Sequence, residues 1–162
     1  MDAKVQVDFN PEVVARYRLV GFENRAIEDE QFRDDTVDAG EIGAGHDITA
    51  LYEIKLHPDT SGRIATVFMR WQDPESKEVI ELNREFGSIE LIENFSKASS
   101  YFQWDVVVAE FAEILRESYW AQGTNLSGLL EEVERVSSLM NDDPDVLEFV
   151  EMVRRANRLW VD

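Results

Sequence analysis

The sequence contains no cysteine, only two histidines and no apolar run long enough to cross a membrane. Without cysteine there are no disulfides, thiolate nucleophiles or cysteine-based zinc sites, and the redox compartment stays open. A membrane-spanning helix needs about 20 consecutive apolar residues, so we expect no direct insertion into a membrane. No signal peptide precedes the first strand pattern. Because Met1 leads almost directly into that strand, we expect the chain to be a fragment of a longer protein.

Basic residues are also scarce: 16 Lys and Arg stand against 34 Asp and Glu, which gives a net charge of −18. Such a charge repels nucleic acid phosphates and anionic lipid headgroups, so neither is an expected partner. It suits a cationic partner or divalent cations, although solubility alone is the simpler interpretation.

Recognisable catalytic motifs are missing as well. There is no Gly-x-Ser-x-Gly nucleophile elbow. His46 and His57 each stand near a strand end, and neither has a second histidine at the spacing of a zinc site. Pairs of carboxylates are abundant, but in so acidic a chain they do not by themselves indicate glycosidase chemistry. We therefore expect a protein that is not an enzyme.

The 162 residues suffice for one domain, and the first part of it follows a strand pattern. Six segments alternate apolar and polar side chains or are short apolar runs: Val5–Phe9, Val14–Phe22, Ile48–Leu56, Ile64–Trp71, Val79–Leu82 and Ser88–Ile92. Turn residues separate them at intervals of 8–12 residues, with no helix pattern between most of them. Residues 1–93 are thus predicted to form an antiparallel β-sandwich of about six strands.

After Asn94 the apolar period changes to that of a helix. An apolar stripe from Trp104 to Tyr119 predicts a first helix that ends at Gly123, and Leu126 to Met140 predicts a second. Asp143 followed by Pro144 is typical of a helix start, which places a third helix at about 144–159. The predicted fold class is α+β, with a three-helix part at 94–162 packed on the sandwich.

The loop at 34–47, rich in acids and glycines, is the strongest candidate for chemistry. Several carboxylates on one flexible loop suit Ca²⁺ or Mg²⁺, and the weak candidate ligands are Asp35, Asp38, Glu41 and His46. The EF-hand order is absent, and the glycines are more typical of tight turns than of ligand approach. The candidate interaction residues of this loop are Asp38, Gly40, Glu41, Gly43, Gly45 and His46.

The same glycines do not form a phosphate-binding loop, because they precede a strand rather than a helix and stand among carboxylates. A metal-assisted hydrolase that uses this loop is kept as an alternative function.

Aromatic residues gather at the start and end of the first predicted helix. Tyr101, Phe102, Trp104, Tyr119 and Trp120 could line a groove, but aromatic side chains at helical spacing are more typical of a core. A carbohydrate-binding sandwich that uses Trp71, Trp104 or Trp120 is a further alternative. It requires at least one exposed indole ring, whereas we expect mostly buried rings.

Motifs in residues 9–54 resemble one known family. Phe9-Asn10-Pro11, the run Tyr17–Arg25, the loop Asp34–His46 and the strand Thr49–Ile54 are similar to the C-terminal region of bacterial von Willebrand factor type A domain-containing proteins. The likeness implies that an A domain precedes this region and that the protein belongs to the cell envelope. The Asp-x-Ser-x-Ser run of the A domain's metal site is absent here, so its metal chemistry does not transfer, and no cofactor is expected.

Together these observations predict a non-catalytic accessory module that binds protein within a longer polypeptide. The adjacent A domain is one expected partner, and a further protein partner has no identifying motif. Since an unpaired strand edge tends to associate, an isolated fragment is also predicted to form dimers through the edge near Val5–Phe9.

Overall fold

The computed structural model describes residues 3–21, 32–33, 47–141 and 143–160. The chain divides into two compact units, residues 1–91 and residues 92–162, and each is considered by itself below. The predicted packing of the helices on the β part therefore stays a prediction. Among the described residues, no helix is both long enough and apolar enough to span a membrane.

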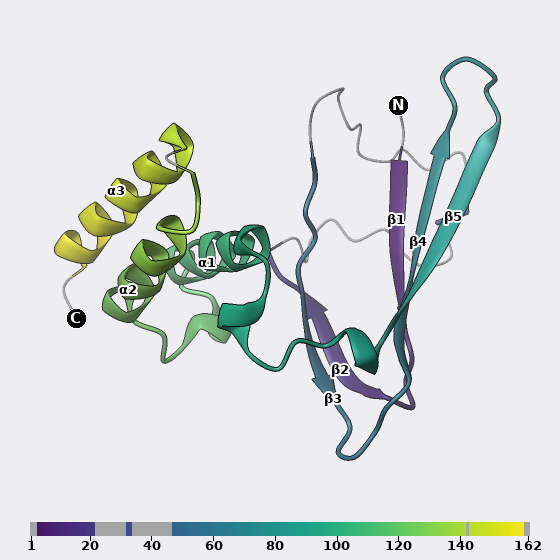
Figure 1. Cartoon of the computed structure of the whole chain (residues 1–162), viewed down its shortest axis with the longest axis horizontal. Coiled ribbons are helices and arrows are strands. Elements are labelled where there is room, and N and C mark those ends of the chain that lie inside the picture. The colour runs from purple at the N-terminus through teal and green to yellow at the C-terminus, as the bar shows by residue number, and fades with distance from the viewer. Residues whose placement is uncertain (1–2, 22–31, 34–46, 142, 161–162) are drawn as a thin grey trace. The chain divides into compact units, whose positions relative to one another are not determined.

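The first unit is built from two antiparallel sheets. Strands β1 (Ala3–Phe9), β4 (Arg63–Gln72) and β5 (Val79–Gly87) form a sheet in the order β1-β4-β5. Strands β2 (Val14–Leu19) and β3 (Tyr52–Leu56) form the second sheet, and Figure 1 shows both. Mixed α+β structure is thus confirmed, whereas a sandwich of six strands is not.

The two sheets meet at a corner beside Asn10. The Asn10 backbone N–H donates to the Ile64 carbonyl at 2.8 Å, and its side-chain amide donates to the Arg63 carbonyl at 2.9 Å. Across the same corner, the His57 backbone N–H donates to the Val13 carbonyl at 2.9 Å. These bonds hold the β1–β2 connection and the β3–β4 connection together, and a small core forms beside them. Its buried residues are Val13, Val14, Ile64 and Ala65.

The prediction of two strands at Val79–Leu82 and Ser88–Ile92 is wrong. Residues from Val79 to Gly87 form the single strand β5, and Ser88–Glu90 form a 3-10 turn. β4 is ten residues long and pairs with β5 along nearly its whole length. This pairing keeps residues 83–85 in the strand, although they are polar and interrupt the apolar alternation in the sequence. The strand ends where the Gly87 N–H donates to the Glu90 carboxylate at 2.8 Å.

β3 is shorter than predicted, because residues 48–51 are not part of a strand. The Ile48 side chain is exposed, so the apolar alternation there marks no buried face.

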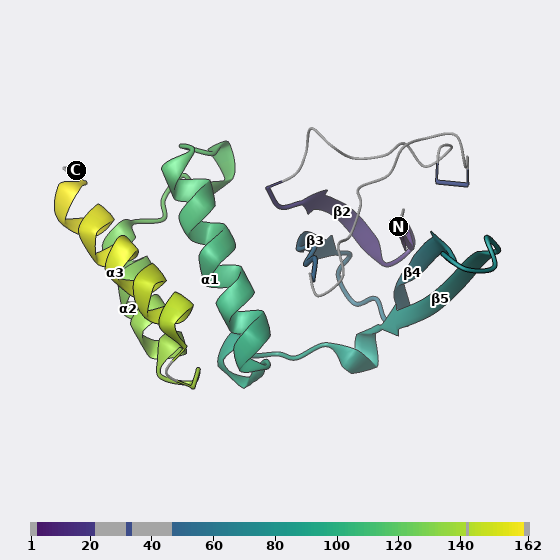
Figure 2. The same cartoon turned by 90° about the horizontal axis from the view of Figure 1, so that it is seen from above.

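The second unit consists of three helices, α1 (Ser100–Leu115), α2 (Leu126–Ser137) and α3 (Pro144–Leu159), which lie side by side in Figures 1 and 2. Their shared core is built from nine buried side chains: Val107, Phe111, Ile114, Leu126, Leu129, Val133, Val136, Val150 and Val153. Each helix begins at a residue whose side chain accepts a backbone N–H. These caps are Ser99, Asn125 and Asp143. The prediction of a third helix over 144–159 is confirmed.

The first helix ends earlier than predicted, at Leu115 rather than near Gly123. Glu117 adopts a left-handed conformation with φ of 53°, and the Ser118 N–H donates to the Glu113 carbonyl at 2.9 Å. The Glu117 N–H donates to the Ile114 carbonyl, also at 2.9 Å. This is the Schellman arrangement, in which glycine usually occupies the left-handed position. Because a glutamate occupies this position, the sequence did not indicate that the helix ends here.

Candidate functional site

The loop residues singled out from the sequence lie outside the part of the chain that the structure describes. They are Asp35, Asp38, Gly40, Glu41, Gly43, Gly45 and His46. Their roles as metal ligands or interaction residues therefore stay predictions. Within the described ranges, no group of three or more metal-ligating side chains comes together. His57 is described and lies exposed in the turn between β3 and β4.

Between β2 and β3, the described residues Phe32 and Arg33 lie against the three-stranded sheet. Phe32 is almost fully buried, and its ring lies edge-on to Phe68 of β4 with centroids 6.4 Å apart. The Arg33 guanidinium lies 6.0 Å from the centroid of the same Phe68 ring and 2.9 Å from the Glu81 carboxylate of β5. These two residues thus contact both β4 and β5.

Glu81 is shared by two arginines. Besides Arg33, Arg70 of β4 lies 3.3 Å from its carboxylate. The hydrogen bond from Arg33, followed by the charge of Arg33 and the weaker contribution of Arg70, lowers the pKa of Glu81 against the opposing effect of burial. Glu81 thus links Arg33 to β4 and β5 through two ion pairs.

One face of the three-stranded sheet is apolar except at Arg84 of β5. Directly paired residues of antiparallel strands share a face, and the pairing gives four rows: Ala3–Trp71–Ile80, Val5–Met69–Leu82, Val7–Val67–Arg84 and Phe9–Ala65–Phe86. The row of Phe9 packs against the corner core. The row at the other end is half-buried, and the two rows between them expose large apolar side chains.

The uncovered side chains are large. Leu82 is 59% exposed, Val5 56% and Met69 41%. We call this part of the face the open sheet face; it comprises the exposed Val5, Val67, Met69 and Leu82 and the half-buried Trp71 and Ile80. The opposite face carries polar rows such as Lys4–Arg70–Glu81 and is the side to which Phe32 attaches. Alternation of the strands thus separates a polar face from an apolar one.

Exposed apolar side chains also lie at each end of α1. Tyr101 is 72% exposed, Tyr119 71% and Trp120 50%, and the last two rings meet edge-on with centroids 5.3 Å apart. We call the group after the C-terminal end of α1 the aromatic helix surface; it comprises Leu115, Tyr119 and Trp120, and Tyr101 and Phe102 are exposed at the other end. The prediction that these aromatic rings form a core is wrong.

Only one face of α1 turns inward, which explains the error. Val107, Phe111 and Ile114 point to α2 and α3, and Trp104 is half-buried against Phe149 with ring centroids 5.2 Å apart. Tyr119 and Trp120 follow the helix end at Leu115 and are not on the helix at all.

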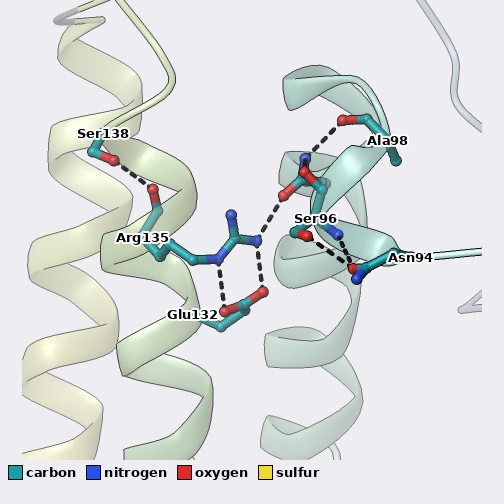
Figure 3. A network of polar contacts seen from close by, with 7 residues as sticks. Asn94, Ser96, Ala98, Glu132, Arg135 and Ser138 are labelled. Atoms are coloured by element: carbon teal, nitrogen blue, oxygen red, sulfur yellow. Dashed lines mark hydrogen bonds and ion pairs between the residues drawn. The ribbon is translucent and has the colours of Figure 1, made fainter.

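A buried polar network ties the start of α1 to α2, and no sequence pattern indicated it. The Gln103 side chain is 1% exposed. Its amide donates to the Ala98 carbonyl at 2.7 Å, and its oxygen accepts from Arg135 at 2.6 Å. Arg135 also donates to Glu132 with bonds of 2.6 and 2.9 Å (Figure 3).

The hydrogen bonds from Arg135 lower the pKa of Glu132 against a smaller opposing effect of burial. Every polar group of this network is occupied by another, so it holds the second unit together and offers no free acid or base.

A shallow hollow of about 300 Å³ opens at the start of α2, where its wall includes Glu110, Asn125 and Glu132. Asn125 already accepts the Gly128 N–H at 2.7 Å, and Glu132 is bound by Arg135. Asn125 and Glu132 thus serve the helix cap and the ion pair.

The family model described as "Uncharacterized protein YfbK, C-terminal" matches residues 1–62 and 55–159. The chain therefore belongs to this family. It is similar to the "Uncharacterized protein YfbK" of Escherichia coli (strain K12), with 27% identity over 177 residues that cover 96% of this chain and 29% of that protein. The chain thus spans less than a third of that relative's length. No solved structure matches, and neither description names a von Willebrand A domain.

Proposed function

We propose that this chain is a non-catalytic interaction module of a longer polypeptide and that it binds protein through its apolar surfaces. The observation that carries the proposal is the open sheet face. It exposes large apolar side chains on three adjacent strands of a chain with a net charge of −18. In a sequence so rich in charged residues, a continuous exposed apolar patch is typical of a binding surface.

The state of the acidic side chains supports a role without catalysis. A general acid or base works best with a pKa near the working pH, which for a glutamate means a raised pKa. Glu81, Glu132 and Glu151 instead have lowered pKa values, in each case mainly because an arginine donates a hydrogen bond to the carboxylate. These glutamates are suited to hold fixed charge rather than to transfer protons.

The resemblance in residues 9–54 supports a more specific proposal. The neighbouring domain in the longer polypeptide is a von Willebrand A domain, and the protein works in the cell envelope. A β-sandwich of about six strands, as expected from the sequence, is part of the same proposal.

Site-specific photo-crosslinking in cells that make the longer polypeptide tests the interaction function. A photoreactive amino acid replaces Leu82 of the open sheet face or Tyr119 of the aromatic helix surface, and Glu85, an exposed residue on the opposite face of β5, serves as the control. Protein crosslinks at Leu82 or Tyr119 well above those at Glu85 are expected. Equal yields at all three positions contradict the proposal.

Carbohydrate binding is a second candidate, favoured by one observation. Trp120 and Tyr119 expose their rings side by side, and exposed aromatic rings can stack on sugars. Titration of the chain with soluble oligosaccharides, followed by tryptophan fluorescence, tests it. A change in the wild type that is absent from Trp120→Ala supports this candidate, and an unchanged spectrum removes it.

A further inference from the structure

From the open sheet face we infer a specific occupant: the part of the same polypeptide that precedes β1. This inference rests on the proposed function and names the partner of one of its two surfaces.

The place where β1 begins supports this occupant. β1 starts at Ala3, which pairs with Trp71, and Trp71 pairs with Ile80 of β5. This is the outermost row of the open sheet face. The family is described as a C-terminal region, and the matched region is 29% of the Escherichia coli relative. In such a protein, the preceding polypeptide joins the sheet beside the open sheet face.

The size of the patch favours a tethered partner over a free one. The exposed fractions of its side chains, applied to side chains of about 150–200 Å², give roughly 400 Å² of uncovered apolar surface. A stable complex of two free proteins buries about 800 Å² on each partner. A partner in the same chain has an effective concentration of about millimolar, so a smaller surface suffices. The patch is therefore too small for a stable dimer but large enough for docking within one polypeptide.

The chain offers a matched pair of positions for a test. Leu82 and Val79 are apolar residues of β5 with exposed fractions of 59% and 41%. Leu82 pairs with Met69 on the open sheet face, whereas Val79 pairs with Gln72 and lies on the opposite face. Because the chain has no cysteine, a single cysteine introduced at either position is its only thiol.

The experiment measures the rate of maleimide labelling of Leu82→Cys and Val79→Cys, located by mass spectrometry. Both variants are made in this chain and in the purified longer polypeptide encoded by the same reading frame. In the isolated chain both cysteines should react quickly. In the longer polypeptide, labelling at position 82 should slow by about tenfold or more, because the thiol becomes buried, while position 79 keeps its rate.

Several outcomes overturn the inference. Equal rates at position 82 in both forms would show that the preceding polypeptide leaves the face open, and a reading frame with nothing before residue 1 has the same consequence. Protection in the isolated chain that disappears on dilution identifies a second copy as the occupant. Protection that does not depend on concentration assigns the face to another segment of this chain.

The purified sample contains no other protein, so its result is independent of the crosslinking in cells. Rapid labelling at position 82 together with a crosslink from Leu82 to a different protein overturns this inference and leaves the proposed function intact. Absence of both protection and crosslinks at Leu82 and Tyr119 overturns both.

Discussion

The two units bury their apolar side chains to very different degrees. Residues 92–162 contain a core of nine buried apolar residues drawn from all three helices, whereas among the described part of residues 1–91 the corner core has four. Within the described residues, the longer unit thus has the smaller buried apolar cluster and exposes apolar side chains on one face of its sheet. The three helices bury their apolar side chains against one another.

The difference follows from how each element finds its neighbours. A helix completes its backbone hydrogen bonds within itself, so three short amphipathic segments with short connections can close a core. A strand completes them only with partners that lie far away in sequence. β1 and β4, for example, pair across more than fifty residues. Pairing of the three strands leaves both faces of the sheet to be covered by other parts of the protein, and the corner core covers only one end of the apolar face.

The largest predicted effect tests the core of the second unit. Phe111 is 4% exposed and lies edge-on to Phe149 at 5.5 Å. Phe111→Ala should lower the free energy of unfolding of this unit by about 3–5 kcal/mol, because it removes buried contacts and leaves a cavity. Urea unfolding followed by the helical circular dichroism band measures it. Phe86→Ala, at a half-buried position of the first unit, is the comparison and should cost less. An equal loss for both would contradict the difference between the cores.

The buried network of the second unit predicts the next largest effect. Gln103→Leu leaves the Ala98 carbonyl without its donor and Arg135 without one acceptor. The expected loss is about 1–3 kcal/mol in the same urea experiment. The control is Ser127→Ala, which removes an exposed hydrogen bond to Asn157 and should change stability by less than about 0.5 kcal/mol. If both variants unfold at one urea concentration, the network is not important for stability.

Each unit also contains a non-glycine residue in the left-handed region that permits a stabilising change. Glu117 ends α1 with φ of 53°, and Lys77 lies in the turn between β4 and β5 with φ of 61°. Glu117→Gly and Lys77→Gly should each raise the free energy of unfolding by about 0.5–1 kcal/mol, because glycine adopts this conformation without strain. The matched control is Gly128→Ala, which places a Cβ 3.3 Å from the Asn125 side chain and should not stabilise. Lower melting temperatures for both glycine variants would show that the native contacts of Glu117 and Lys77 outweigh the strain.

Acid should weaken both units through glutamates bound by arginine. The pKa of Glu81 in the first unit and that of Glu151 in the second are lowered from 4.5, chiefly by hydrogen bonds from Arg33 and Arg158. A carboxylate with a lowered folded pKa contributes stability above its unfolded pKa, and this contribution is lost as the pH falls through the folded value. Because the pairs are exposed, the effect is small.

Glu81→Gln separates the two contributions. The substitution should make the stability of the first unit less sensitive to acid. Unfolding of this unit is measured by the fluorescence of Trp71 in a variant with the other three tryptophans replaced by phenylalanine. The helical band of the second unit should keep its acid profile. If the stability of the first unit in the Glu81→Gln variant falls with acid as much as in the wild type, the Glu81 ion pairs do not contribute to its acid sensitivity.

The smallest expected effect concerns the acidic loop at 34–47. Since the glycines and acids there are more typical of a structural loop than of a cation site, millimolar Ca²⁺ or Mg²⁺ should leave the melting temperature unchanged. Scanning calorimetry with and without each cation measures this, and a variant with Asp38 and Glu41 changed to Asn and Gln is the control. A rise that this variant abolishes would restore the metal-assisted alternative.

Much of the second unit could be read from the sequence. The acid and proline at 143 and 144 predicted the start of α3 correctly, because a cap and a restricted backbone angle act within one turn of helix. The end of α1 could not be predicted, since a glutamate occupies the position that usually holds glycine. The exposure of Tyr101 was missed because its spacing is compatible with a core, and only the packing of the three helices shows which face of α1 turns inward. The exposure of Trp120 was missed because the end of α1 before it was not predicted.

The acidic composition, the absence of thiols and the change from strand to helix period were determined by the sequence alone, because each is a property of neighbouring residues. The tertiary structure decided the rest: the single long strand β5, the enclosure of Gln103 between two helices, and the side of the sheet that stays open. Each depends on residues far apart in the chain being brought into register, and the period of a segment does not encode which distant segment will cover it.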